Sequence, residues 1–414
     1  MIFMDQNVSE RIFARIDSYR DEAVKIQSEL TAIPALSPSS GGEGEWRKAL
    51  KLKEYMDAVG YDSFEEYNAP CPALKEGTRP NHVYRFKGLD SSRTVWIMSH
   101  LDIVPPGDLK LWNTDPYAVK EEGDVLYGRG VEDNQQGIVS SLLAVRALRE
   151  EKIAPKYDVA LLFISDEETG SFDGIQYVLK MKPDLFSKDD LIYVPDSGVP
   201  DGSRIEVAEK SIMWLKFTTK GMQAHASRPQ CGINAFKAAS NLVVRLQALY
   251  EIFGGRNEIF EPPTSTFEPT KKEANVPNVN SIPGEDVFYL DCRVLPVYDL
   301  EKVFEEVRRI ADGVERDFGV KVLIDFAQRE QAAPETSPDS DVVRLCAAAV
   351  RDVYRVEPRA CGIGGGTVAA HIRRLGYPAV VWSRLNDTAH QANEHCLVSN
   401  VLGDAKVFAH IAAL

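Results

Sequence analysis

The sequence predicts an α/β protein with a mostly parallel mixed sheet flanked by helices and an inserted α+β domain. Short all-apolar segments alternate with helical patterns in the first half of the chain and again near its end, as parallel strands covered on both faces do. Between residues 210 and 328 the expected strands alternate apolar and polar residues, which is typical of a sheet with one open face. Together these two patterns indicate two domains, the first of them discontinuous.

The first expected elements are helices. Apolar residues at helical spacing predict a helix over 9–32 that ends before Pro34, and another over Trp46–Val59 that ends at Gly60. The strands expected in the parallel sheet are 94–99, 159–165, 191–194 and 378–383. The helices expected to cover them are 137–150, Ile175–Met181 and 399–413.

The inserted domain is expected at 210–328. Its strands are predicted at 212–221, 286–296 and 320–326, and its helices at 234–250 and Leu300–Phe318. This order of strands and helices predicts a ferredoxin-like arrangement. The remaining residues, 1–209 and 329–414, form the larger domain.

The composition argues against nucleic-acid and membrane partners. The 414-residue chain has a formal net charge of -14 and no Lys/Arg-rich run, so it offers no basic surface to phosphates. No stretch approaches the roughly 20 apolar residues of a membrane span, and the N-terminal segment lacks the basic start and apolar run of a signal peptide. The six cysteines are scattered without a C-x-x-C pair, which is typical of a reduced cytoplasmic protein.

Acidic residues and histidines stand where the expected parallel strands end. They are His100, Asp102, Asp133, Glu167, Glu168, Asp196 and His390. In open α/β sheets ligands bind outside the carboxyl ends of the strands, so these side chains should converge. Three consecutive carboxylates at 166–168 would repel one another at a buried strand end unless a cation lies nearby. The alternative is a solvated acidic turn with ordinary helix caps and structural histidines.

Six motifs follow one another along the chain: SHLDIV, GRGVEDNQQG, SDEETGS, VPDSG, AHASRPQCGINA and AHQANEH. In order and approximate spacing they resemble the dinuclear zinc peptidase and deacylase family. That family includes glutamate carboxypeptidase G, acetylornithine deacetylase, succinyl-diaminopimelate desuccinylase, aminoacylases and carnosine-type dipeptidases. The resemblance extends over essentially the whole chain. It implies a metal-binding catalytic domain and, at 210–328, a lid and dimerisation domain.

The resemblance implies two divalent metal ions, with zinc as the expected metal and cobalt or manganese as alternatives. One ion would be held by His100, Asp133 and Asp196. The other would be held by Asp133, Glu168 and His390, so that Asp133 bridges the two. The resemblance also implies a cis peptide bond directly after Asp133.

Three further residues have catalytic roles in this resemblance. Glu167 would be the general acid and base toward a water that bridges the metals, and Asp102 would orient His100 through its second ring nitrogen. His225, in the inserted domain, would donate a hydrogen bond to the oxyanion of the tetrahedral intermediate, and the alternative is an ordinary turn histidine. Asp166 is expected to point away and has no expected role.

The resemblance also indicates substrate-binding residues, namely Asn280, Arg293, Gly365, Gly366 and Thr367. Asn280 stands in NVNSIPG, and Arg293 matches an arginine that often binds a substrate carboxylate. For Arg293 the alternative is an ordinary ion pair. The other three would open a helix whose free N–H groups suit an anionic group.

We therefore expect a metal-dependent amidohydrolase that cleaves a peptide or N-acyl-amino-acid bond of a small substrate and forms a homodimer through 210–328. The alternatives are a zinc aminopeptidase of another α/β fold and a relative that binds a metal or ligand without turnover. Gln135 and Gln136 stand beside the expected metals where family members often have Lys or Gly, and this departure leaves the substrate class open more than the metal binding. The histidines expected to be structural or on the surface are His82, His371, His395 and His410.

Overall fold

The computed structural model describes residues 6–414, so the first five residues of the expected larger domain lie outside the description. The chain divides into two compact units. Unit 1 runs to Val207 and also contains Thr336–Cys361 and Thr367–Leu414, whereas unit 2 contains Ala208–Glu335 and Gly362–Gly366. Residues 329–335 and 362–366, which we expected in the larger domain, therefore belong to unit 2. Strand β16 (Lys321–Glu330) continues past the expected boundary, and the Gly362 N–H donates to the Ile259 carbonyl of unit 2.

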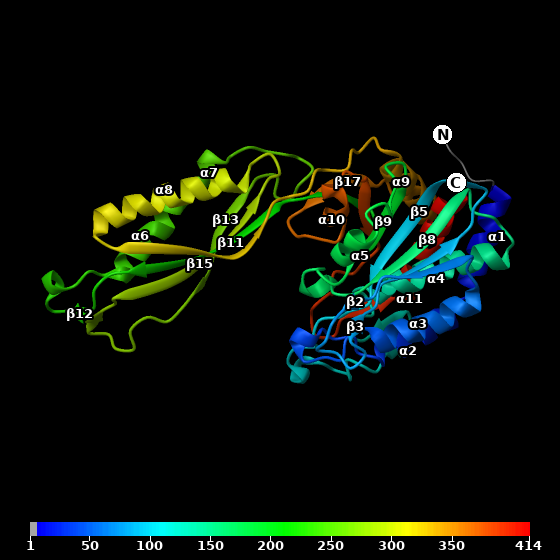
Figure 1. Ribbon diagram of the computed structural model, residues 1–414, viewed down its shortest axis with the longest axis horizontal. Coiled ribbons are helices and arrows are strands. Elements are labelled where there is room, and N and C mark those ends of the chain that lie inside the picture. The colour runs from blue at the N-terminus through cyan, green and yellow to red at the C-terminus, as the bar shows by residue number, and fades with distance from the viewer. Residues whose placement is uncertain (1–5) are drawn as a thin grey trace. The chain divides into compact units, whose positions relative to one another are not determined.

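An eight-stranded sheet forms the centre of unit 1 (Figure 1). Its strands lie in the order β1 (Ser63–Glu66), β4 (His82–Phe86), β8 (Tyr157–Ile164), β5 (Asp90–His100), β9 (Leu191–Gly198), β18 (Ala379–Ser383), β10 (Arg204–Glu209) and β17 (Arg359–Ile363). The strands β8, β5, β9 and β18 pair in parallel, whereas β1, β4 and β10 pair antiparallel with their neighbours. The predicted α/β fold with a mixed sheet is confirmed, and the four strands that pair in parallel lie in the middle of the sheet.

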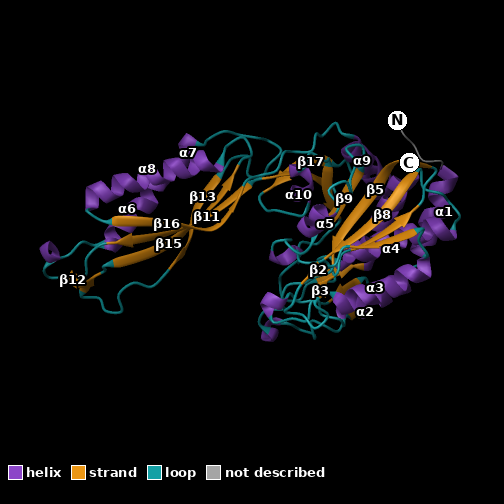
Figure 2. Cartoon of the chain, in the orientation of Figure 1, coloured by secondary structure: helices purple, strands orange, loops and turns teal. Residues whose placement is uncertain are grey.

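Helices flank this sheet on both faces (Figure 2). They are α1 (Gln6–Asp17), α2 (Arg20–Thr31), α3 (Trp46–Val59), α4 (Gln135–Glu150), α5 (Ile175–Met181), α9 (Asp341–Tyr354), α10 (Ala369–Arg374) and α11 (Val398–Ala413). Helices α5 and α10 pack on the face that carries Trp96, Met98 and Leu162. Helices α4 and α11 contact each other, and α4 also contacts β5, β8 and β9. The strands are apolar on both faces because both faces are covered.

Unit 1 also contains short strands and 3-10 turns within its loops. They are β2 (Ala69–Pro70), β3 (Thr78–Arg79), β6 (Lys120–Glu122), β7 (Val125–Tyr127), β19 (His395–Leu397) and the 3-10 turns η1 (Pro38–Ser40), η2 (Leu109–Leu111) and η3 (Glu167–Thr169). Strand β19 pairs with β7, which brings the segment after His390 beside the segment before Asp133. Among residues 6–414, no helix combines the length and apolar character needed to cross a membrane.

The helix predicted over 9–32 is two helices, α1 and α2. The Ser18 hydroxyl donates to the carbonyl of Arg15 at 2.6 Å, and the Ser18 N–H bonds to the carbonyls of both Ala14 and Arg15. A side chain that bonds the local backbone in this way competes with helix continuation. The apolar spacing continues across the break, because Ile16 and Ala23 lie seven residues apart and both are fully buried.

Unit 2 has a four-stranded antiparallel sheet with helices on one face. Its strands lie in the order β13 (Thr266–Lys272), β15 (Glu285–Val294), β11 (Ser211–Lys220) and β16. Helices α6 (Ala235–Leu246) and α8 (Leu300–Phe318) share a core with inward residues such as Met213, Leu215 and Phe217, while Trp214 between them is exposed. The helix expected over 234–250 is interrupted, and α7 (Leu249–Ile252) follows α6. This is the predicted ferredoxin-like unit.

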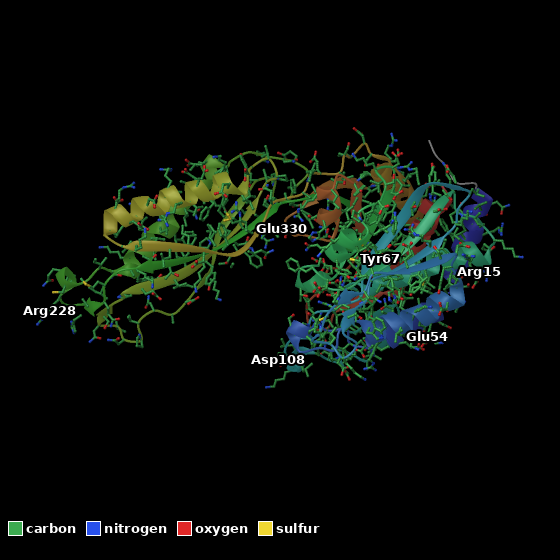
Figure 3. The ribbon with its side chains drawn as sticks, viewed as in Figure 1. Arg15, Glu54, Tyr67, Asp108, Arg228 and Glu330 are labelled. Atoms are coloured by element: carbon green, nitrogen blue, oxygen red, sulfur yellow. The ribbon has the colours of Figure 1, made fainter. Side chains whose placement is uncertain are left out.

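A two-stranded ribbon lies at one end of unit 2. It consists of β12 (Ala224–His225) and β14 (Ser281–Ile282), with the 3-10 turn η4 (Pro229–Cys231) following β12. Figure 3 shows Arg228, next to this turn, and Glu330, at the end of β16, at opposite ends of the unit. The ribbon therefore projects beyond the main sheet of unit 2.

Candidate metal centre

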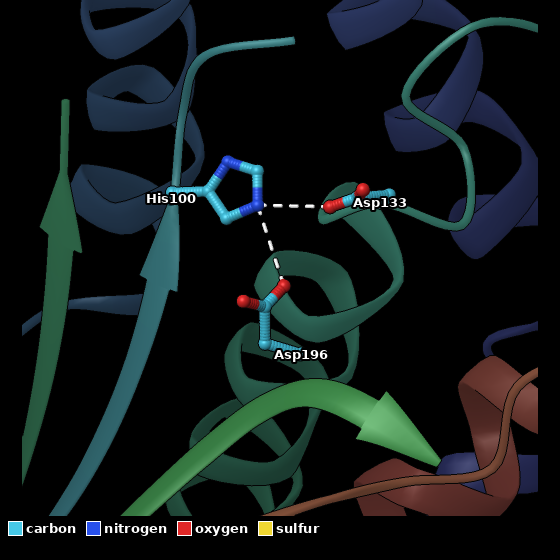
Figure 4. Close-up of side chains that lie close together, drawn as sticks. All are labelled: His100, Asp133 and Asp196. Atoms are coloured by element: carbon cyan, nitrogen blue, oxygen red, sulfur yellow. Dashed lines mark hydrogen bonds and ion pairs between the residues drawn. The ribbon is translucent and has the colours of Figure 1, made fainter. Parts of the chain in front are cut away.

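The strand ends of unit 1 bring three predicted ligands together (Figure 4). His100 ends β5, Asp196 lies in the neighbouring strand β9, and Asp133 precedes α4. The His100 Nε2 atom lies 2.9 Å from Asp133 Oδ1 and 3.3 Å from Asp196 Oδ1. The three ligand atoms lie within 4.8 Å of one another, which is close enough for one cation to contact all of them. The peptide bond from Asp133 to Asn134 is cis, as predicted.

A second group of three shares Asp133 with the first. The His390 Nε2 atom lies 3.1 Å from Asp133 Oδ2 and 3.1 Å from Glu168 Oε2. These ligand atoms also lie within 4.8 Å of one another. Asp133 thus presents one carboxylate oxygen to each group, which is the geometry of a carboxylate that bridges two cations.

A buried carboxylate that the sequence analysis missed holds the turn before Asp133. Glu394 accepts the backbone N–H groups of Gly130, Glu132 and Asp133 at 3.0, 3.0 and 3.1 Å. Arg129 donates to the same carboxylate at 2.5 Å. Burial raises the pKa of Glu394 to about 7, with the Asp133 carboxylate adding to the rise. The only feature of the sequence that could have indicated this role is that Glu394 stands four residues after the predicted ligand His390.

The three consecutive acids at 166–168 have three different environments. The Asp102 carboxylate accepts the backbone N–H groups of Glu167 at 3.1 Å and of Glu168 at 3.0 Å, which fixes their turn. Glu168 belongs to the second ligand group, whereas Glu167 belongs to neither. Asp166 is buried and accepts a 2.5 Å hydrogen bond from Arg79. Its charge is therefore neutralised by a guanidinium away from the ligand groups.

Asp102 contacts the second ring nitrogen of His100 through both its main chain and its side chain. The Nδ1 atom of His100 lies 3.0 Å from the backbone carbonyl oxygen of Asp102 and 3.5 Å from its carboxylate. The carbonyl can only accept, so Nδ1 carries the proton and Nε2 is left as the ligand atom. Asp102 therefore orients His100 mainly through its main chain, while its side chain supports the Glu167–Glu168 turn.

The loop that carries His390 is held by the neighbour of the shared aspartate. Glu132 is buried, and its carboxylate accepts the N–H of Asn386 and the N–H and hydroxyl of Thr388, the last two at 2.6 and 2.7 Å. His390 itself has a φ of 64° and is half exposed. Glu132 thus holds the loop that carries His390, next to Asp133 in the same group, although no sequence pattern singled out Glu132.

Burial and neighbouring charges shift the pKa values of this cluster. Burial, followed by the Asp196 carboxylate, raises the pKa of Glu167 well above its usual value. Burial alone would lower the pKa of His100, but Asp196 and the other nearby carboxylates raise it well above its usual value. Burial would raise the pKa of Asp133, yet hydrogen bonds from His100 and His390 lower it. This crowded set of carboxylate oxygens and imidazole nitrogens fits divalent ions such as zinc, cobalt or manganese.

An ionic network lies behind the cluster. Arg79, buried on β3, donates to Glu45 and to Asp166. Lys48, three residues after Glu45, is also buried, and its ammonium has no hydrogen-bond partner in the described part of the chain. Burial lowers the pKa of Lys48 to about 8, against the opposing effect of the Asp102 and Glu45 carboxylates. Fully buried lysines without a partner are rare.

Gln135 and Gln136 are the first two residues of α4 and directly follow Asn134. The Gln135 side chain donates to Gln27 at 3.1 Å and to Thr31 at 2.8 Å, both on α2. The Gln136 side chain donates to Asp404 on α11 at 2.8 Å. Both side chains thus join the start of α4 to neighbouring helices. The histidines outside the two ligand groups found in residues 6–414 are His82, His225, His371, His395 and His410.

His225 and Asn280 lie side by side in unit 2. His225 is paired with Ser281 in the β12–β14 ribbon, and the Ala226 N–H donates to the Asn280 carbonyl at 2.8 Å. Both residues are exposed. The Nδ1 atom of His225 accepts a hydrogen bond from the Ser227 N–H at 3.2 Å. The ribbon thus brings together one predicted catalytic residue and one predicted substrate-binding residue.

Arg293 is engaged within unit 2. Its guanidinium pairs with Asp291 through two hydrogen bonds of 2.7 and 3.0 Å and donates to the Gly364 carbonyl at 2.9 Å. This matches the ordinary ion pair that the sequence left open. Gly365 and Gly366 belong to unit 2, and Thr367 belongs to unit 1. These three residues lie just before α10, which begins at Ala369, and the Thr367 hydroxyl accepts the Ala369 N–H at 3.2 Å.

Two candidate groups of metal ligands share one aspartate at the strand ends of a mixed α/β sheet, which is the arrangement expected of a metallohydrolase. The sequence profile of Peptidase family M20/M25/M40 matches residues 96–414. An "uncharacterized metallohydrolase" of Methanococcus maripaludis is 40% identical over 415 residues, covering 95% of this chain and 99% of the relative. A succinyl-diaminopimelate desuccinylase of Delftia acidovorans is 25% identical over 390 residues, which cover 91% of this chain and 94% of the relative. The crystal structure of human carnosine dipeptidase 1 superposes with a TM-score of 0.74 at 19% identity and covers 98% of each chain.

The chain therefore belongs to the M20/M25/M40 peptidase family and is a hydrolase acting on carbon–nitrogen bonds. The alternative of a zinc aminopeptidase with another α/β fold is wrong, because the family match covers most of the chain. The family resemblance inferred from the six motifs is confirmed.

Proposed function

We propose that the protein cleaves a peptide or N-acyl-amino-acid amide bond, with Glu167 as the general acid and base. One observation carries the proposal. Glu167 is a half-buried acid that belongs to neither ligand group, yet its backbone is fixed beside the ligand-group residue Glu168 by the Asp102 carboxylate. A site that only binds metal or ligand has no need of such an additional carboxylate. The raised pKa of Glu167 suits a group that has to accept a proton and give it up again.

The proposed reaction is hydrolysis, in which a C–O bond forms and the C–N bond breaks. Metal ions held by the two groups, zinc in our proposal and cobalt or manganese as alternatives, would polarise the scissile carbonyl and lower the pKa of water to about 7. Glu167 takes a proton from the attacking water and delivers it to the leaving nitrogen. His225 donates a hydrogen bond to the developing oxyanion. Asn280, Arg293, Gly365, Gly366 and Thr367 remain the proposed substrate-binding residues, with Arg293 the least available.

Two measurements test this function. Elemental analysis of the purified protein should find two divalent ions per chain. A panel of dipeptides, N-acetyl amino acids and N-succinyl amino acids should contain at least one substrate whose hydrolysis stops in the presence of a chelator. The matched control is Glu167→Gln, which keeps the size of the side chain. Bound metal without turnover of any amide in the panel would favour the relative that binds without catalysis.

We also propose a homodimer formed through residues 210–328. The sheet of unit 2 ends in strands β13 and β16, and an uncovered sheet edge favours pairing with another chain. In such a dimer, His225 of one chain would serve the metals of its partner. Co-refolding Glu167→Ala with His225→Ala chains should then restore activity to roughly a quarter of wild type, because about half the dimers are mixed and each has one complete site of two. No recovery despite proven exchange would mean that His225 acts within its own chain.

We propose a cytoplasmic location for the enzyme. All six cysteines are unpaired, and Cys292, Cys346 and Cys396 are buried. Free buried thiols persist in a reducing compartment. Cell fractionation with an antibody against the protein would place it directly.

A further inference from the structure

Two pairs of polar side chains on the β12–β14 ribbon are joined by hydrogen bonds. Ser227 donates its backbone N–H to Nδ1 of His225 at 3.2 Å, and its hydroxyl lies 2.8 Å from the same atom. Asn278 donates its side-chain amide to Oδ1 of Asn280 at 2.5 Å and to the Ser281 hydroxyl at 2.8 Å. Because His225 is paired with Ser281 across the ribbon, the two pairs are neighbours.

The backbone of Ser227 determines which nitrogen of His225 carries the proton. A backbone N–H can only donate, so Nδ1 has to accept, and the neutral ring then carries its proton on Nε2. The Ser227 hydroxyl, which donates to the same lone pair, also restrains rotation of the ring. His225 is exposed, so its Nε2–H is a donor that a substrate can reach.

Asn278 has the corresponding effect on Asn280. Its amide N–H holds the carbonyl oxygen of the Asn280 side chain, so the Asn280 amide nitrogen is directed away from Asn278. An amide nitrogen donates only, whereas an amide oxygen accepts only. With this orientation the two neighbours, His225 and Asn280, both present donors. With either group reversed, a lone pair would replace the donor and repel an anion.

We propose that Ser227 and Asn278 are positioning residues that set the hydrogen-bonding polarity of the ribbon, so that His225 and Asn280 both donate to an anionic group. The acceptor is the developing oxyanion or a carboxylate of the substrate. This inference rests on the proposed roles of His225 and Asn280. Donors that are already oriented before the reaction stabilise developing negative charge without having to reorganise, so they lower the activation barrier.

The first test compares Ser227→Ala with Ser227→Thr, which keeps a hydroxyl. Ser227→Ala should lower kcat about 5-fold, the usual worth of one hydrogen bond, and leave KM within about twofold. Ser227→Thr should retain most of the wild-type kcat. In protein labelled with ¹⁵N-histidine, the His225 resonances, assigned with His225→Ala, should show a proton on Nε2. Ser227→Ala keeps the backbone N–H, so the proton should stay on Nε2, and the Nδ1 resonance should shift only by the loss of the hydroxyl hydrogen bond.

The second test compares Asn278→Asp with Asn278→Ala. An aspartate at this position can still bond Asn280, but only by accepting, so the Asn280 amide would turn and present its oxygen. Asn278→Asp should therefore lower kcat/KM about 10-fold, and Asn278→Ala, which leaves the amide free to rotate, about threefold. A purely structural role predicts the opposite order, because aspartate preserves the hydrogen bond. Repeating the assay in 1 M salt, where the Debye length is about 3 Å, removes the effect of the added charge.

The outcomes separate this inference from the proposed function. Full activity of His225→Ala would overturn the proposed role of His225, and the positioning role with it. An inactive His225→Ala variant combined with a fully active Ser227→Ala variant would overturn the positioning role alone. The same conclusion would follow for Asn278 if Asn278→Asp were more active than Asn278→Ala at high salt.

Discussion

The metal centre of unit 1 and the β12–β14 ribbon of unit 2 are constructed in opposite ways. In the metal centre, ligand-bearing turns are fixed by buried carboxylates, with Asp102 and Glu394 both 0% exposed. On the ribbon, His225 and Asn280 are exposed, and each is held by the side chain of one neighbour. The difference fits the two proposed roles: a cation site gains from a rigid, charge-balanced surrounding, whereas a donor to a transient anion has to be correctly oriented.

The largest effect is expected at the residue that both ligand groups share. Asp133→Ala removes one ligand from each group, so the variant should lose both metal ions and all measurable activity. Elemental analysis and the amide panel measure both effects. A variant that keeps both ions would show that Asp133 does not bridge them.

A smaller effect is expected on the ribbon. His225→Ala should lower kcat by about 10²–10³-fold, the usual cost of losing one oxyanion donor, while metal content stays at the wild-type value. A lowered kcat together with unchanged metal content would show that His225 acts on the reaction and does not hold the metal. Loss of metal in this variant would mean that the ribbon contributes to metal binding, contrary to the separate roles proposed for the two regions.

The smallest effect on activity is expected at Lys48, behind the metal centre. Burial lowers its pKa from 10.5 to about 8, so the folded state disfavours the charged form that the unfolded chain keeps. The cost is fully present below pH 8 and disappears as the pH rises from 8 to 10.5. Lys48→Met should therefore increase the free energy of unfolding at pH 7 by about 1–3 kcal/mol and lower kcat only a few-fold.

Urea unfolding at pH 7 and pH 10 measures this difference. The advantage of Lys48→Met over wild type should be smaller at the higher pH. A variant that is less stable than wild type at pH 7 would mean that the ammonium compensates the Asp102 and Glu45 carboxylates more strongly than burial penalises it.

The residues of the two candidate ligand groups could be picked out from the sequence because each stands at the end of a recognisable strand or before a helix. The residues that hold these side chains in place could not be predicted. Glu394 holds the N–H groups of residues 130–133 across more than 260 residues of sequence, and no local pattern distinguishes it from a surface acid. The break at Ser18 was hidden for a related reason. Apolar spacing reports which residues are buried, and that spacing continues across the break.

The central claim is that Glu167 moves the proton and does not hold the metal. The most direct measurement is the metal content of Glu167→Gln together with its rate on the best amide of the panel. The account predicts two divalent ions per chain, as in wild type, and a rate lowered by at least about 10³-fold. Loss of an ion, or a rate close to wild type with both ions present, would contradict it.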